Sequence, residues 1–103
     1  MNESRKKLIE DCKRDIQRYE PYGKVFYEFS WSNIVNLQIP IDETSLHYGL
    51  DYCKSMMKLK TLLDQRHTDN EVEKRLHKID ADIRLMEKVL KHDLDHRGLL
   101  LHL

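Results

Sequence analysis

Two histidines stand four residues apart near the C-terminal end of the chain, in the run His92-Asp93-Leu94-Asp95-His96. Side chains with this spacing share one face of a helix, where two imidazoles can chelate a divalent metal ion. A structural zinc site uses four ligands, and the HExxH motif of zinc hydrolases has a glutamate where this chain has Asp93. Because the spacing alone is weak evidence, we expect no metal or cofactor, and a metal-binding protein that uses His92 and His96 is the third hypothesis for the function. The favoured interpretation is a solvated helix end, where histidines interact favourably with the helix dipole.

The two cysteines, Cys12 and Cys53, both lie among apolar residues. A reactive thiolate requires an electropositive, partly exposed setting, whereas a buried cysteine behaves as a small hydrophobic residue. The sequence has no CxxC motif, and with three glycines it has little material for a phosphate-binding loop. We therefore predict two buried, reduced thiols in a cytoplasmic protein that is not an enzyme.

Most of the aromatic residues fall between residues 19 and 31. Aromatic side chains dominate binding hot spots and stack on bases, but they also fill protein cores. The residues that we expect to bind a partner in this region are Tyr22, Phe26, Trp31 and Ile34. The alternative hypothesis is that the aromatic cluster binds a small ligand or a nucleotide with the help of Arg14, Arg18 and Lys24.

The first half of the chain predicts one helix followed by two strands. Apolar residues at spacings of three and four predict a helix over residues 4–19, which Pro21 and Gly23 should end. From residue 24 to residue 41 the apolar period changes to two, which predicts a β-hairpin that turns near Ser32 and Asn33. An isolated hairpin is marginally stable in water, so we expect it to pack on the helices or to pair with another chain.

The second half predicts an antiparallel pair of helices, over residues 44–67 and 70–97. The second of these carries apolar residues at alternating steps of four and three, a heptad pattern. The residues of this predicted oligomer seam are Leu76, Ile79, Ile83, Met86 and Leu90. At about 1.5 Å per residue the helix spans roughly 40 Å, which is long for a small domain. The apolar tail, residues 99–103, either folds back onto its own core or docks on another chain through Leu99, Leu100 and Leu101.

Composition bounds the class of protein. The chain has 103 residues, of which 35% are charged and 40% hydrophobic, and it carries 18 acidic and 18 basic residues. The absence of a basic excess disfavours nucleic acid as a partner, and no apolar run is long enough to cross a bilayer. We therefore predict a single α+β domain, mostly helical and of order α-β-β-α-α. Its expected function is a non-enzymatic protein-interaction module of the adaptor or inhibitor type that forms a homodimer.

Overall fold

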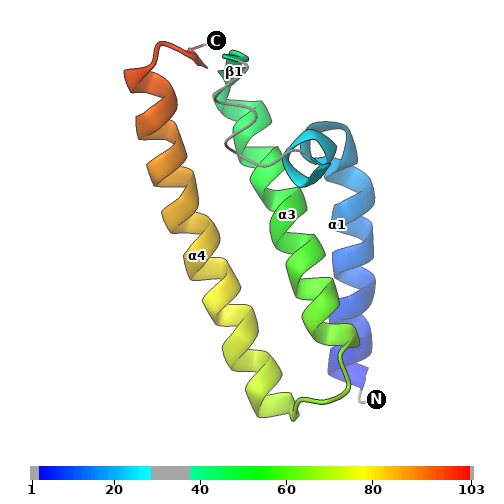
Figure 1. Ribbon diagram of the computed structural model, residues 1–103. Coiled ribbons are helices and arrows are strands. Elements are labelled where there is room, and N and C mark those ends of the chain that lie inside the picture. Colours follow the sequence, from blue (N-terminus) through cyan, green and yellow to red (C-terminus); the bar gives the residue numbers. More distant parts are fainter. Residues whose placement is uncertain (1–2, 29–37, 103) are drawn as a thin grey trace.

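The computed structural model describes residues 3–28 and 38–102, except for the side chains of residues 24–28. Within these ranges the protein is predominantly helical, as the sequence predicts (Figure 1). Its elements are α1 (Glu3–Glu28), β1 (Ile41–Asp42), α3 (Glu43–Leu63), α4 (Asp69–His96) and β2 (Leu100–Leu101).

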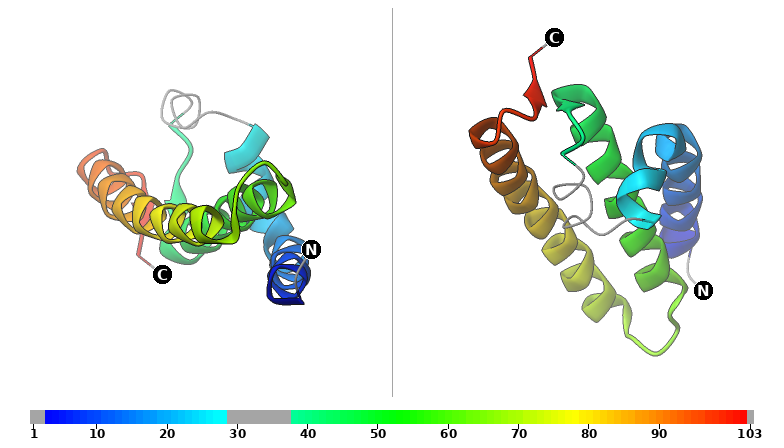
Figure 2. Two further views of the ribbon diagram at one scale, coloured as in Figure 1. Left: turned by 90° about the horizontal axis from the view of Figure 1, so that it is seen from below. Right: turned by 45° about the horizontal axis from the view of Figure 1, so that its top comes forward.

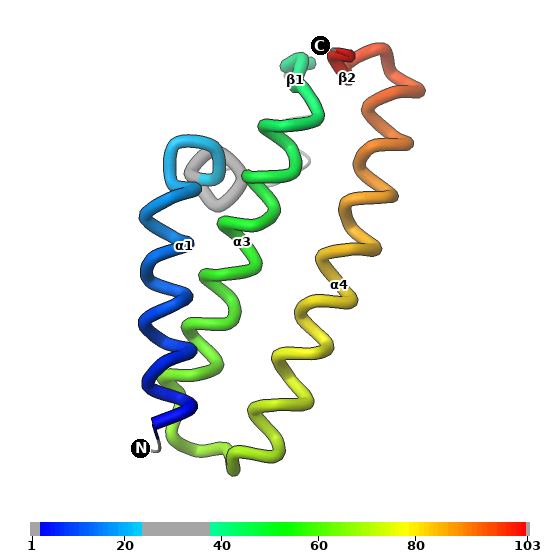
Figure 3. Tube along the Cα trace, turned by 180° about the vertical axis from the view of Figure 1, so that it is seen from behind, coloured from blue at the N-terminus to red at the C-terminus, as the bar shows by residue number. Residues whose placement is uncertain are grey.

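Helix α3 lies between the other two helices, with α1 on one side and α4 on the other (Figures 1 and 2). Consecutive helices run in opposite directions, and the ends of α3 and α4 that are joined by the short connection lie near the N-terminus of α1 (Figure 3). The molecule measures 47 × 22 × 22 Å, so its length is close to that of α4. Among the described elements, α4 has its helical neighbour α3 on one side, and no described helix lies on the opposite side.

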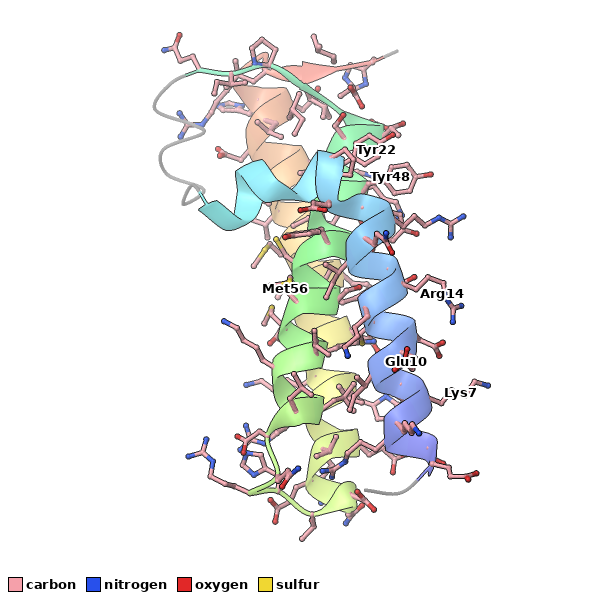
Figure 4. All side chains as sticks on the ribbon, turned by 90° about the vertical axis from the view of Figure 1, so that its right-hand side faces the viewer. Lys7, Glu10, Arg14, Tyr22, Tyr48 and Met56 are labelled. Atoms are coloured by element: carbon pink, nitrogen blue, oxygen red, sulfur yellow. The ribbon has the colours of Figure 1, made fainter. Side chains whose placement is uncertain are left out.

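The prediction that the first helix ends before Pro21 is wrong, because α1 continues through Pro21 to Glu28. A proline inside a helix removes one backbone hydrogen bond and bends the axis. The last part of α1 accordingly turns away from the direction of the first part and crosses over α3 (Figure 4). Gly23 is buried at this crossing, where a Cβ atom would overlap the Cβ and Cγ atoms of Tyr52. Glycine therefore permits a close approach of two helices here and does not release a turn.

The predicted β-hairpin over residues 24–41 is not what the structure shows. Residues 24–28 are helical, and residues 29–37 lie outside the described residues, as do Trp31 and Ile34 and the side chain of Phe26. The sheet that is described pairs Ile41 with Leu100 and Asp42 with Leu101, in parallel register. The partner of β1 is thus the C-terminal tail, brought alongside it by the return of α4, and not a neighbouring strand across a tight turn.

Capping side chains fix where α3 and α4 begin. The Oδ1 atom of Asp42 accepts a hydrogen bond of 2.7 Å from the backbone N–H of Ser45, and the hydroxyl of Thr68 accepts one of 3.2 Å from Glu71. Both residues satisfy a backbone donor that the helix itself leaves unpaired. Helix α3 ends at Leu63, four residues earlier than predicted, where Asp64 leaves the helical conformation. Gly98 has a φ of 71°, which favours glycine and lets the chain turn back after α4.

Two clusters of buried residues form the core. One joins α3, α4 and β2 through Leu46, Leu50, Ile79, Ile83, Leu90, Leu94 and Leu100. The other joins α1, α3 and α4 near the N-terminus through Ile9, Cys12, Leu62 and Val72. Leu76 is partly buried against both clusters.

The heptad pattern of α4 is therefore satisfied within one chain. Ile79, Ile83 and Leu90 are 7%, 6% and 6% exposed because they pack in the core that α4 shares with α3. Within the single chain, the core therefore already buries three of the residues that the sequence assigns to an oligomer seam. Met86 differs from the rest of the predicted seam, because it is 46% exposed.

Candidate interaction surface

The outer face of α4 carries Leu85 and Val89, which are 63% and 57% exposed. They are the most exposed of the large apolar side chains that the structure describes. The two residues are one helical turn apart and are followed at steps of three and four by His92 and His96. We call these four residues the outer face of α4.

Helix geometry separates this surface from the core. At 100° per residue, Leu85 points about 160° away from Ile83 and about 140° away from Leu90. Buried and exposed apolar residues therefore occupy opposite sides of the same helix. A helix that packs on one neighbour needs one apolar seam, and α4 has a second one on its exposed side. The inner seam is filled by α3, whereas the outer seam is covered by no residue that the structure describes.

A salt bridge and a hydrogen bond between α3 and α4 hold the helix in this orientation. Lys58 Nζ lies 2.6 Å from Asp80 Oδ1, and His47 Nδ1 lies 2.8 Å from Glu87 Oε1. Both pairs flank the buried seam on the same side of α4, because positions 80 and 87 are two turns apart. Exposed pairs contribute little to stability, but together they oppose rotation of α4 about its axis. The outer face of α4 is thus held toward solvent.

A shallow groove lies on the other flank of α4. It is lined by Met57 and Lys60 of α3 and by Arg75, Ile79 and Asp82 of α4, among others, and has a volume of about 360 Å³. Met86 follows Asp82 by one turn on this flank, so its exposed side chain extends the apolar surface from the groove toward Val89.

Tyrosines of α1 and α3 pack on one another near the bend in α1. The rings of Tyr19 and Tyr48 are stacked with their centroids 5.1 Å apart, and the ring of Tyr22 is tilted against Tyr48 at the same distance. Arg18 places its Cζ atom 5.9 Å from the centroid of the Tyr19 ring. With these tyrosines it lines a cleft of about 310 Å³.

This tyrosine cluster is first of all a contact between helices. Figure 4 shows Tyr22 and Tyr48 side by side, with Arg14 farther along α1. Arg14 pairs with Asp11 at 3.2 Å, and the side chain of Lys24 lies outside the described residues. Of Arg14 and Arg18, the two of these basic residues whose side chains are described, Arg18 is the one that lies at the aromatic rings.

The apolar tail folds back onto its own chain at Leu99 and Leu100. Leu100 is 8% exposed and belongs to the core, and Leu99 packs against that core. The backbone N–H of Leu99 donates to the carbonyl of Leu94 at 2.8 Å, and the N–H of Ile41 donates to the carbonyl of Leu99 at 2.9 Å. Leu101 points outward and is 42% exposed. Of the three leucines expected to bind a partner, Leu101 alone is open to solvent.

The cysteines are unpaired, as the sequence predicts. Cys12 is buried and Cys53 is partly buried. Burial raises the pKa of the Cys12 thiol, against a smaller lowering effect of Lys58, and burial likewise raises the pKa of Cys53. A raised pKa reduces the thiolate fraction, so both thiols are poor nucleophiles.

The part of the chain that the structure describes lacks two further classes of site. No three or more histidine, cysteine or acidic side chains gather there around a point where a metal ion could sit. None of the described helices combines the length and the apolar character that crossing a bilayer requires.

The surface that sequence reasoning missed is the one formed by Leu85 and Val89. Its signal is present in the sequence, because positions 85, 89, 92 and 96 repeat the alternation of four and three on the side opposite the first seam. Tyr48 was missed as well, since its contacts with Tyr19 and Tyr22 come from the packing of α1 on α3.

Comparison of the chain with protein-family models, with curated proteins and with solved structures found no match.

Proposed function

We propose that this chain is a non-enzymatic protein-interaction module that forms a homodimer through the outer face of α4. The observation that carries the proposal is the pair Leu85 and Val89, which exposes a second apolar seam on a helix whose first seam is already filled. Large apolar side chains grouped on one face, rather than scattered singly, mark interaction sites.

The spacing along this face favours a helix as the partner. Positions 78, 82, 85, 89, 92 and 96 follow one another at alternating steps of four and three, the repeat with which two helices interlock their side chains. Leucine and valine stand at the centre of the repeat, and Lys78, Asp82 and the two histidines stand at its ends. An apolar centre with polar ends is the usual organisation of an interface.

Charges along the repeat favour a second copy in antiparallel orientation. If Leu85 of one copy lies against Val89 of the other, Asp82 faces His92 of the second copy, and the same contact occurs twice because the pairing is symmetric. A parallel arrangement would instead place Asp82 against Asp82 and Lys78 against Lys78, which is unfavourable. Asp82 forms no ion pair within the described residues, so its carboxylate is available for such a contact.

Sedimentation velocity over a concentration series of the purified chain tests the proposal. The wild-type protein should pass from 12.5 kDa monomer to dimer as its concentration rises. Leu85→Lys should keep it monomeric without unfolding it, because residue 85 is 63% exposed within the single chain. Leu63→Lys is the matched control: Leu63 is also 51% exposed, but it lies at the end of α3 and should leave the dimer intact. A wild-type chain that remains monomeric at several hundred micromolar would refute the homodimer.

A further inference from the structure

His92 and His96 differ from the other four histidines of the chain in their surroundings. His47, His67, His77 and His102 each lie within 4.0 Å of at least one carboxylate oxygen. No such contact is made to His92 or His96 by the described residues. Their rings lie beside each other instead, with centroids 6.5 Å apart and planes 16° from parallel.

Two neighbouring imidazoles without a carboxylate are suited to hold a cation between them. An imidazole binds a metal ion through the lone pair of one ring nitrogen, and histidine is the commonest metal ligand in proteins. Both side chains are exposed, so rotation about their side-chain bonds can point one nitrogen of each ring at a common ion about 2.1 Å away. Two ligands alone form a weak site, and the described residues of the single chain offer no third at this place.

The antiparallel pairing proposed above supplies the missing ligand. In that register, Asp82 of the second copy stands against His92, on the same face as His96. We infer that His92 and His96 of one copy bind a divalent zinc-like cation together with Asp82 of the second copy, so that each dimer holds two ions. Two histidines, one carboxylate and one water complete a tetrahedral coordination that zinc commonly adopts.

This inference rests on the proposed homodimer and adds a condition to it, because an ion held by both copies stabilises the dimer over the monomer by mass action. The proposed site also requires two chains, because its ligands are too far apart within one chain. Asp82 and His92 are ten residues apart on one straight helix, or about 15 Å, so an aspartate at position 82 can reach the ion only from the other chain.

Sedimentation velocity of the full chain with EDTA, and with one equivalent of zinc chloride, tests the inference. Zinc should lower the dissociation constant of the dimer at least tenfold, and elemental analysis of the isolated dimer should find one zinc per chain. His96→Ala and Asp82→Ala should each abolish the tightening of the dimer by zinc, with the dissociation constant of each variant in EDTA as its own reference. The controls His77→Ala and Glu73→Ala alter exposed residues of the same helix and should respond to zinc as the wild type does.

A mixture of two variants that each fail to bind zinc gives the most specific test of a site shared between two copies. Asp82→Ala keeps both histidines and His92→Ala keeps the aspartate, so a mixed dimer contains one complete site of the two. Random pairing of equal amounts makes about half of the dimers mixed, so mixing should restore about a quarter of the zinc that the wild type binds. Circular dichroism of each variant checks that it remains folded.

The outcomes separate the two proposals. A dimer in EDTA that zinc leaves unchanged overturns the metal site and supports the homodimer. A chain that is monomeric in both conditions overturns both. Undiminished zinc binding by Asp82→Ala, or failure of the mixed variants to regain binding, also overturns the shared site.

Discussion

Gly23 of α1 lies against Tyr52 of α3 so closely that a Cβ atom at position 23 would overlap the Cβ and Cγ atoms of the tyrosine. The contact involves the root of the tyrosine side chain and not its flexible end. Rotation of the ring cannot relieve it, so either α1 or α3 would have to move. The bend at Pro21, two residues earlier, is what turns this part of α1 across α3 (Figure 4).

Gly23→Ala should therefore destabilise the protein, by about 1–3 kcal/mol, as overpacking of a tight contact does. The sign of the effect is informative. Alanine is favoured over glycine by about 1 kcal/mol in a helix without such a contact, so a free position would gain stability. Urea denaturation of Gly23→Ala measures the difference. Gln17→Ala, at an exposed position of the same helix, should be close to neutral.

A second variant checks that the neighbour is Tyr52. Tyr52→Ala retains the Cβ atom with which the new methyl group collides, and so should not rescue Gly23→Ala. An increase in stability of Gly23→Ala alone would show that α1 and α3 do not approach this closely.

Ile83 and Leu85 are two positions apart on α4, but truncation to alanine should destabilise the protein at Ile83 and have little effect at Leu85. Ile83 is 6% exposed within the core, so Ile83→Ala should cost about 2–5 kcal/mol through lost burial and the cavity that remains. Leu85 is 63% exposed, and Leu85→Ala should change the unfolding free energy of the monomer by less than about 0.5 kcal/mol. Urea denaturation at a protein concentration low enough to exclude dimer measures both. Equal costs would mean that α4 is rotated from the orientation described above.

The helices of the second half of the chain were predictable because their pattern is long. The repeat from Val72 to Leu90 runs over more than five turns and places its apolar residues on one side of a helix. Thr68 caps the start of this helix, and Gly98 lets the chain turn after its end. The partner of that face was not predictable. A heptad pattern states that a seam is buried but does not state whether α3 or another chain buries it.

The region around Pro21 shows where local rules lose to tertiary packing. A proline followed by a glycine usually ends a helix, and five alternating residues from 24 to 28 are too few to distinguish strand from helix. Here the bent helix is retained, with Gly23 against Tyr52 and Tyr22 against Tyr48. These contacts join residues far apart in the chain, so no pattern within residues 19–28 reveals them. Likewise, the tail pairs with β1 because α4 returns it to that place.

Asp42 should stabilise the protein only where its carboxylate is ionised. The backbone N–H of Ser45 donates to this carboxylate and lowers its pKa in the folded chain, and the Ser45 hydroxyl donates to it as well at 3.0 Å. A lowered folded pKa means that the contribution is fully present above the unfolded pKa of about 3.9, and is lost as the pH falls through the folded value.

The melting temperature of Asp42→Ala should therefore be lower than that of the wild type at pH 7, and the difference should shrink below pH 4. Asp64, whose pKa is lowered chiefly by its hydrogen bond with the Arg66 side chain, titrates with the same sign in both proteins and cancels from the comparison. Asp42→Asn keeps a capping oxygen without a charge, so its deficit relative to the wild type should be smaller than that of Asp42→Ala and should likewise shrink below pH 4. A difference between Asp42→Ala and the wild type that is constant from pH 7 to pH 2 would contradict the capping role.

Cys12 and Cys53 should react slowly with a thiol reagent in the native protein, and Cys12 more slowly. Cys12 packs with Ile9, Leu62 and Val72, so reagent reaches it only when α1 separates from α3, whereas Cys53 is partly accessible. Burial raises the pKa of both thiols, so at pH 8 each has a smaller thiolate fraction than in the unfolded chain, and its rate of labelling should rise as the pH increases.

Stopped-flow labelling with Ellman's reagent measures each thiol separately in Cys53→Ala and Cys12→Ala. In 8 M urea the two should react at similar rates, which provides the control for intrinsic reactivity. Rapid labelling of Cys12 in the native protein, at a rate close to that in urea, would show that the cluster joining α1 to α3 and α4 does not shield it.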